Sequence, residues 1–129
     1  MFSGTRPDNL GVKDGRFIAC KPSPNCVSSQ ADPADQEHYI MPIAFGGTMH
    51  ELRRAVESME RAAVIREEGH YLHAEYTSKL MGFVDDVELL LDEKARLVHV
   101  RSASRLGRRD FGVNRERIEK LRSLIGSGR

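Results

Sequence analysis

Residues 83–105 read FVDDVELLLDEKARLVHVRSASR, and this stretch decides the fold. Apolar and polar side chains alternate through residues 83–91 and again through 96–105, on either side of the polar connection Asp92-Glu93-Lys94-Ala95. Alternation with a period of two is typical of a strand with one buried face, and a short polar connection joins two such strands antiparallel. The stretch therefore predicts the central hairpin of an antiparallel sheet.

Two further strands, at about 62–67 and 70–77, precede this hairpin. Their connections, around Gly69 and around residues 78–81, are short and polar, so neighbouring strands are expected to pair as an antiparallel meander. Thr48 and Glu51 form a capping-box pattern that opens a helix ending near Glu60. We therefore expect one helix directly before the four strands.

A second helix is expected after Gly112, with Asn114 as its cap and Gly126 at its end. The predicted fold is α+β: a four-stranded antiparallel meander sheet with two helices on one face. Residues 1–47 hold all five prolines and show no sustained periodicity, so they are expected to form an irregular packed arm. We expect residues 1–129 to be a single domain, with the α-β-β-β-β-α body at 48–125 and a frayed tail at 126–129.

The composition excludes several classes of protein. The chain has 129 residues, with 20 Lys and Arg against 19 Asp and Glu, which argues against a generic nucleic-acid binder. No apolar run is long enough to span a membrane and no secretory signal is visible, so a cytoplasmic chain is expected. Cys20 and Cys26 would normally stay as thiols in that compartment, whereas a bridge between them is reasonable if a signal has been removed.

One face of the sheet is predicted to gather polar side chains. If Leu91 faces Arg96 and Thr77 faces Gly82, the pairs His73–Asp86, Tyr71–Glu88, Glu88–His99 and Asp86–Arg101 become neighbours. We call this set the polar face: Tyr71, His73, Glu75, Asp86, Glu88, His99 and Arg101. It is either a solvated face with cross-strand charge pairs, or a site whose imidazoles and carboxylates act as acid and base. Because no spacing matches an established ligand pattern, no metal and no cofactor are predicted.

The segment 101–115 runs from a strand through two glycines to a helix N-terminus, where free amides favour an anion. Arginines can fork onto a phosphate or carboxylate while neutral side chains add donors. The candidates are Arg101, Arg105 and Arg115, with Ser104 and Asn114. Residues 101–129 hold nine basic and three acidic residues, so the near-neutral total conceals a basic C-terminal part. The alternative is that these arginines pair with Asp85, Asp110 or Glu116 and tie the last helix to the sheet.

The cysteine segment 20–30 is the third candidate. Cys26 is followed by Ser28 and Ser29, and a thiol nucleophile needs a nearby base such as His73 or His99. The alternative is that Cys26 is a buried structural residue.

The motifs in these segments follow one another in a recognisable order. They are Gly4-Thr5-Arg6-Pro7, Leu10-Gly11-Val12, residues 23–30 (SPNCVSSQ), residues 71–75 (YLHAE), residues 83–88 (FVDDVE), residues 99–107 (HVRSASRLG) and residues 112–115 (GVNR). In this order they resemble the domain of unknown function 1499 (DUF1499) family over almost the whole chain. The resemblance implies a small bacterial-type domain with relatives in plastids and with no established activity. Its motifs coincide with the three candidate segments.

Our leading hypothesis is a binding domain for a small anionic ligand. It uses Arg101, Arg105, Arg115 and the last helix's N-terminus, with the cysteine segment as a lid and Ser28, Ser29, Glu75 and Glu88 as further contacts. The first alternative is a hydrolase or transferase with Cys26 as nucleophile, His73 or His99 as base, and Asp86 or Glu88 as the orienting carboxylate. The second alternative is an interaction module whose polar face docks a protein partner.

Overall fold

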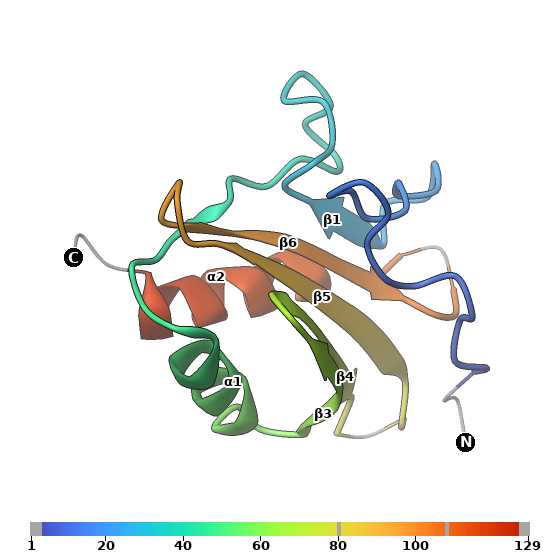
Figure 1. Cartoon of the computed structure of the whole chain (residues 1–129). Coiled ribbons are helices and arrows are strands. Elements are labelled where there is room, and N and C mark those ends of the chain that lie inside the picture. The colour runs from blue at the N-terminus through green and yellow to red at the C-terminus, as the bar shows by residue number, and fades with distance from the viewer. Residues whose placement is uncertain (1–3, 80, 108, 127–129) are drawn as a thin grey trace.

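The computed structural model describes residues 4–79, 81–107 and 109–126 (Figure 1). The elements are β1 (Cys26–Ser28), β2 (Ile43–Ala44), α1 (Met49–Glu57), β3 (Ala62–Glu68), β4 (Tyr71–Thr77), β5 (Val84–Asp92), β6 (Leu97–Ser104) and α2 (Val113–Ile125). An antiparallel sheet and two helices confirm the predicted α+β class. The expected fraying after Gly126 concerns residues 127–129, which lie outside the described part of the chain.

Among the residues that the structure describes, the sheet has six strands, so the prediction of four was wrong. The order is β1-β6-β5-β4-β3, and β2 also pairs with β6. The additional strands come from the arm and are only three and two residues long, too short to show alternation. They bind the edge of β6 that β5 leaves open, and so cover backbone groups that an edge strand would otherwise expose.

The register of both hairpins differs by two residues from the predicted one. Leu91 lies opposite Val98, and Thr77 lies opposite Val84. In the second hairpin the turn starts one residue later, because the Asp92 carboxylate accepts a hydrogen bond from the Ala95 N–H and Arg96 adopts a left-handed conformation with φ of 56°. An even shift leaves every side chain on its predicted face.

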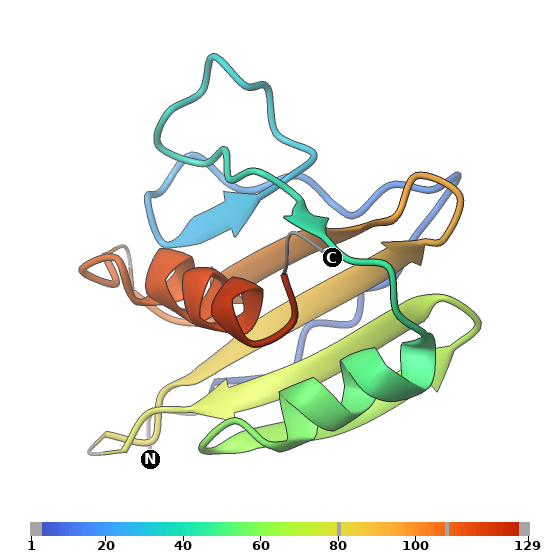
Figure 2. The ribbon, with the colours of Figure 1, turned by 90° about the vertical axis from the view of Figure 1, so that its left-hand side faces the viewer.

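The capping box of α1 is confirmed, since the Thr48 and Glu51 side chains bond to each other's backbone N–H groups. The helix ends at Glu57, before the predicted Glu60. Gly112, and not Asn114, is the N-cap of α2, and Gly126 is its C-cap as predicted. Both helices pack on one face of the sheet, around a core that includes Leu52, Val56, Leu72, Val87, Leu89, Val98, Val100, Ile118 and Leu121 (Figure 2). Within the described residues, neither helix is long and apolar enough to cross a membrane.

The part of the arm that precedes β1 crosses the other face of the sheet, opposite the helices, as Figures 1 and 2 both show. The Gly11 N–H reaches down to the Glu88 carboxylate of β5 at 2.8 Å, and Arg6 reaches Glu75 of β4. The polar face therefore lies between the sheet and the arm.

Candidate functional site

The polar face is buried at its centre. The exposed fraction is 0% for Glu88, 2% for Asp86, 5% for His73 and 8% for Arg101. The interpretation of a solvated sheet face was therefore wrong for these residues, because the arm covers them. Charged groups removed from water need partners, so their contacts determine what the face can do.

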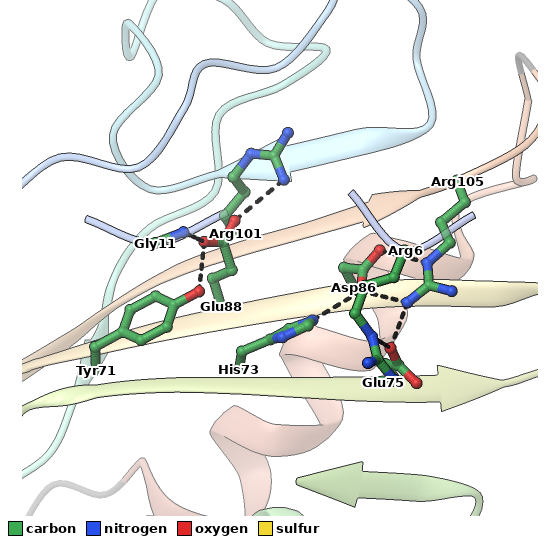
Figure 3. Close-up of polar contacts among 9 residues, drawn as sticks. All are labelled: Arg6, Gly11, Tyr71, His73, Glu75, Asp86, Glu88, Arg101 and Arg105. Atoms are coloured by element: carbon green, nitrogen blue, oxygen red, sulfur yellow. Dashed lines mark hydrogen bonds and ion pairs between the residues drawn. The ribbon is translucent and has the colours of Figure 1, made fainter. Parts of the chain in front are cut away.

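Glu88 is the centre of a first cluster (Figure 3). Its carboxylate accepts hydrogen bonds from the Tyr71 hydroxyl at 2.7 Å, from the Gly11 N–H at 2.8 Å and from Arg101 Nη1 at 3.3 Å. The predicted contact of Tyr71 with Glu88 is thus made, diagonally across the strands. Burial, followed by the negative charge of Glu88, raises the pKa of Tyr71, so the hydroxyl remains a donor.

Asp86 is the centre of a second cluster (Figure 3). It contacts His73 Nε2 at 2.8 Å and both Nε and Nη2 of Arg105, at 2.8 and 2.9 Å. Burial by itself would raise the pKa of Asp86, but the hydrogen bonds from Arg105 and His73 outweigh it and the pKa lies below its usual range. The side chains of Arg6 and Arg105 both bond to Glu75, and they lower the pKa of that carboxyl as well.

None of the four predicted neighbour pairs lies directly opposite, and only Tyr71–Glu88 and His73–Asp86 still make contact, diagonally. His99 lies across from Leu90 instead of Glu88, and Arg101 lies across from Glu88 instead of Asp86. The two-residue change of register causes both differences.

His73, Glu75 and Asp86 bring one ligand atom each within 4.8 Å of one another, which is a plausible donor set for a divalent cation. However, the guanidinium groups of Arg105 and Arg6 bond to these carboxylates, and together they balance the charge that a divalent metal would balance. The arrangement therefore favours an ion-pair cluster over a metal centre.

A cavity of about 220 Å³ lies between the arm and the ends of β5 and β6. Three cations and one carboxylate line it, namely Lys21, Arg101, Arg105 and Asp86. Buried Arg101 Nε has no hydrogen-bond partner, and it is the one such side-chain nitrogen or oxygen found in the described part of the chain. An unsatisfied buried N–H costs about 1–3 kcal/mol, so this packing of Arg101 reduces the stability of the fold. We call this cavity, between the arm and the ends of β5 and β6, the arm cavity.

A disulfide joins Cys20 to Cys26, and Lys21, Ser23, Asn25 and Cys26 form part of the cavity wall. The expectation that the two cysteines stay as thiols therefore differs from the structure. The bond also removes the thiolate that a nucleophilic Cys26 would need. The sequence left a bridge open as an alternative, and spacing alone could not decide between the two.

Ser28 and Ser29 lie in β1 and directly after it, away from the cavity lining. Ser28 Oγ accepts the Gln30 N–H, and Ser29 Oγ accepts the Val100 N–H at 2.8 Å and lies 3.2 Å from His99 Nδ1. Burial lowers the pKa of His99, which also favours the neutral ring. The contacts of Ser29 with Val100 and His99 hold the arm against β6.

The N-terminus of α2 is already occupied by a carboxylate of the protein itself. Asp110 accepts hydrogen bonds from the N–H groups of Gly112 and Asn114, at 2.9 and 3.0 Å. The predicted anion site at these amides is therefore wrong, because an internal anion fills it. Arg115 donates to the carbonyl groups of Gln36 and Glu37 and does not line the arm cavity.

Asn114 is fully buried, and its amide bonds to Ser102, Ser104 and the carbonyl of Asn25. Arg117, which lies two residues beyond the predicted segment 101–115, pairs with Asp85 at 2.8 Å and ties α2 to the sheet. Asn114 and Arg117 are therefore structural residues.

Sequence reasoning did not assign roles to Arg6 and Gly11, although both bind carboxylates of the polar face. It also missed the cap formed by Asp110. The signal for Arg6 and Gly11 was present in the motifs Gly4-Thr5-Arg6-Pro7 and Leu10-Gly11-Val12, which are unusual in an arm without regular structure.

A family model described as a protein of unknown function (DUF1499) matches residues 17–125, which include every strand and helix described above. No curated protein and no solved structure matches the chain.

Proposed function

The chain belongs to the DUF1499 family, and we propose that it binds a small anionic ligand in the arm cavity. The observation that carries the proposal is the lining of the cavity, in which three cations, Lys21, Arg101 and Arg105, stand against the single carboxylate of Asp86. A buried guanidinium such as that of Arg101 retains its charge, so the cavity attracts an anion.

The charge around the cavity supports the same conclusion. Lys21, Arg101 and Arg105 outnumber Asp86 in the lining. Adding the neighbouring charges that bond to this set, Arg6 with Glu75 and Glu88, still leaves one positive charge in excess. The cluster therefore has the capacity to accept one negative charge from outside.

The proposal assigns different roles to the residues predicted from the sequence. Arg101 contacts the ligand, whereas Arg105 keeps Asp86 and Glu75 paired beside the cavity. Glu75 and Glu88 hold the arm through Arg6 and Gly11. The cysteine segment acts as the cavity wall, in place of the predicted lid.

The other two hypotheses have less support. A hydrolase or transferase that uses Cys26 requires a reduced thiol, and the sulfur is bonded to Cys20. A protein partner docked on the polar face would first have to displace the arm, because Glu88 is fully buried beneath it. We therefore keep only anion binding.

Isothermal titration of the protein with sodium acetate, benzoate and inorganic phosphate, at constant ionic strength, tests the proposal. The variant Arg101→Lys retains the charge but loses the guanidinium group, and hydrogen bonds to charged groups contribute about 1.5–3 kcal/mol, so affinity should fall roughly ten- to a hundredfold. The matched control is Arg115→Lys, at an arginine outside the cavity, which should leave affinity unchanged.

Circular dichroism would check that each variant is folded. If Arg101→Lys is unfolded, Lys21→Gln at the exposed rim replaces it, with a smaller expected loss of affinity. The proposal fails if none of the three anions binds the wild-type protein at millimolar concentration, or if both arginine variants bind equally well.

A further inference from the structure

We propose that one end of the molecule, where β4 and β6 terminate and β5 begins, docks on the surface of an anionic lipid membrane. This inference goes beyond the proposed function and does not depend on the arm cavity. Three features of this end lead to it: a group of exposed apolar side chains, an exposed aromatic residue in an unfavourable backbone conformation, and positive charges without partners.

The first feature is the position of the exposed apolar side chains. The connection 78–83 joins β4 to β5, and the segment 105–112 leads from β6 into α2; Figures 1 and 2 both show them at the same end of the sheet. The Arg105 N–H bonds to the Val84 carbonyl, so the two segments start side by side. Nine large apolar side chains are exposed in the described part of the chain, and five of them lie here. We call these five the apolar end: Met81, Phe83, Leu106, Phe111 and Val113.

The second feature is Phe111, which is 92% exposed. Its backbone is left-handed, with a φ of 54°, and it is followed by Gly112 with a φ of 81°. A bulky residue rarely adopts this conformation, which glycine and asparagine adopt more readily. A phenylalanine at this position is therefore unfavourable both for the backbone and for its contact with water. A partner surface that removes the ring from water would offset both costs.

The third feature is the charge beside the apolar side chains. Lys79 and Arg109 are exposed, and neither forms an ion pair with another described residue. The other described charges of the two segments are used within the fold, because Arg105 pairs with carboxylates beneath the arm and Asp110 caps α2. The charge that these segments offer to a partner is therefore positive.

The acidic residues next to this end do not cancel that charge. Glu60 and Glu116 are exposed on the helix side, and the exposed residues Arg61 and Lys120 match them in number. An anionic surface is therefore attracted to the apolar end.

A lipid bilayer fits this combination better than a protein partner does. The apolar side chains come from two connections and from the start of α2, and a protein would need a surface of matching shape to bury all of them. A fluid bilayer accommodates such side chains in any arrangement. Proteins bound at the membrane interface place Phe and Leu among the acyl chains and Lys and Arg beside the anionic headgroups, which are the residue types found here.

The test is flotation of the full chain with lipid vesicles. One set of vesicles contains equal parts of phosphatidylcholine and phosphatidylglycerol, and the other contains phosphatidylcholine alone. The wild-type protein should float with the anionic vesicles. It should bind the neutral vesicles at least about tenfold more weakly, because each of the two free cations contributes roughly fivefold at an anionic surface.

The variant Phe111→Asn tests the aromatic side chain without disturbing the turn, because asparagine tolerates the left-handed backbone. Its affinity for the anionic vesicles should fall roughly ten- to a hundredfold, since the ring can no longer be buried. Leu106→Ser should lower the affinity by about fivefold. The matched control is Leu124→Ser: Leu124 is 47% exposed, against 41% for Leu106, but lies at the other end of α2 and should not affect binding.

A second pair of variants tests the charge. Lys79→Gln should weaken binding to the anionic vesicles by about fivefold and leave binding to the neutral vesicles unchanged. The matched control is Lys94→Gln, an exposed lysine in the turn between β5 and β6 at the opposite end of the sheet, which should change neither.

The outcomes separate this inference from the proposed function. None of the five residues of the apolar end lines the arm cavity, so Phe111→Asn should bind acetate as the wild type does. Wild-type protein that stays in solution with both sets of vesicles would overturn membrane docking and favour a protein partner. Equal binding to the two sets, or equal flotation of wild type and Phe111→Asn, would also overturn it.

Discussion

Arg105→Gln should destabilise the protein strongly, because Arg105 forms ion pairs with two carboxylates beneath the arm. The side chains of Arg105 and Asp86 are only 7% and 3% exposed, and the guanidinium contacts both Asp86 oxygens. Removing one partner of a buried ion pair costs about 3–5 kcal/mol, since the remaining charge loses its compensation. That is a large fraction of the roughly 5–15 kcal/mol by which a domain is stable.

Urea unfolding followed by circular dichroism would measure the loss. Arg53→Gln is the matched control: Arg53 also bridges two carboxylates, Glu57 and Glu67, but its side chain is 38% exposed, so the loss should be much smaller. If Arg105→Gln does not fold, Arg105→Lys takes its place, with a loss of roughly half that size.

The pH dependence provides a second check on the same variant. Without the guanidinium, burial is no longer outweighed and the pKa of Asp86 should rise, so the native state would take up a proton more readily than the unfolded state. The difference in unfolding free energy between wild type and variant should therefore shrink from pH 7 to pH 5. A loss below about 1 kcal/mol with no pH dependence would refute the buried ion-pair cluster.

Two further predictions concern the arm and the carboxylates. Removing the disulfide with the double variant Cys20→Ser, Cys26→Ser should lower the unfolding free energy by roughly 2 kcal/mol, as expected for so short a loop. The double variant should also bind anions more weakly. An unchanged affinity would show that the wall of the arm cavity does not depend on the disulfide. The pKa values of Asp86 and Glu75 are lowered in the folded state, so their contribution to stability should be complete above about pH 4 and be lost as the pH falls through the folded values. Acid unfolding curves of wild type and Asp86→Asn should therefore converge at low pH, and curves that stay parallel would contradict the lowered pKa of Asp86.

The sequence was informative where periodicity carried the signal. Alternation in residues 62–105 and the pair Thr48 and Glu51 located the four-strand meander and the first helix, because a buried face imposes a regular pattern on long elements. The same alternation placed Tyr71, His73, Asp86 and Glu88 on one face. Tyr71 still contacts Glu88, and His73 still contacts Asp86, because a two-residue change of register keeps each side chain on its face.

The rest depended on long-range contacts that no local pattern encodes. Burial of Glu88 follows from Gly11, a residue 77 positions away in the chain, which belongs to an arm without periodicity. The Asp110 carboxylate bonds to the amides that the sequence offered to an external anion, and its role depends on the turn into α2. The unpartnered Nε of Arg101 is a property of packing alone.

The most direct measurement of the central claim is the NMR signal of the Arg101 Nε–H group, assigned by its absence in Arg101→Lys. Addition of sodium acetate at constant ionic strength should shift this resonance, while the Nε–H signal of Arg115 stays in place. An Arg101 signal that does not move at saturating acetate would contradict anion binding beside this arginine.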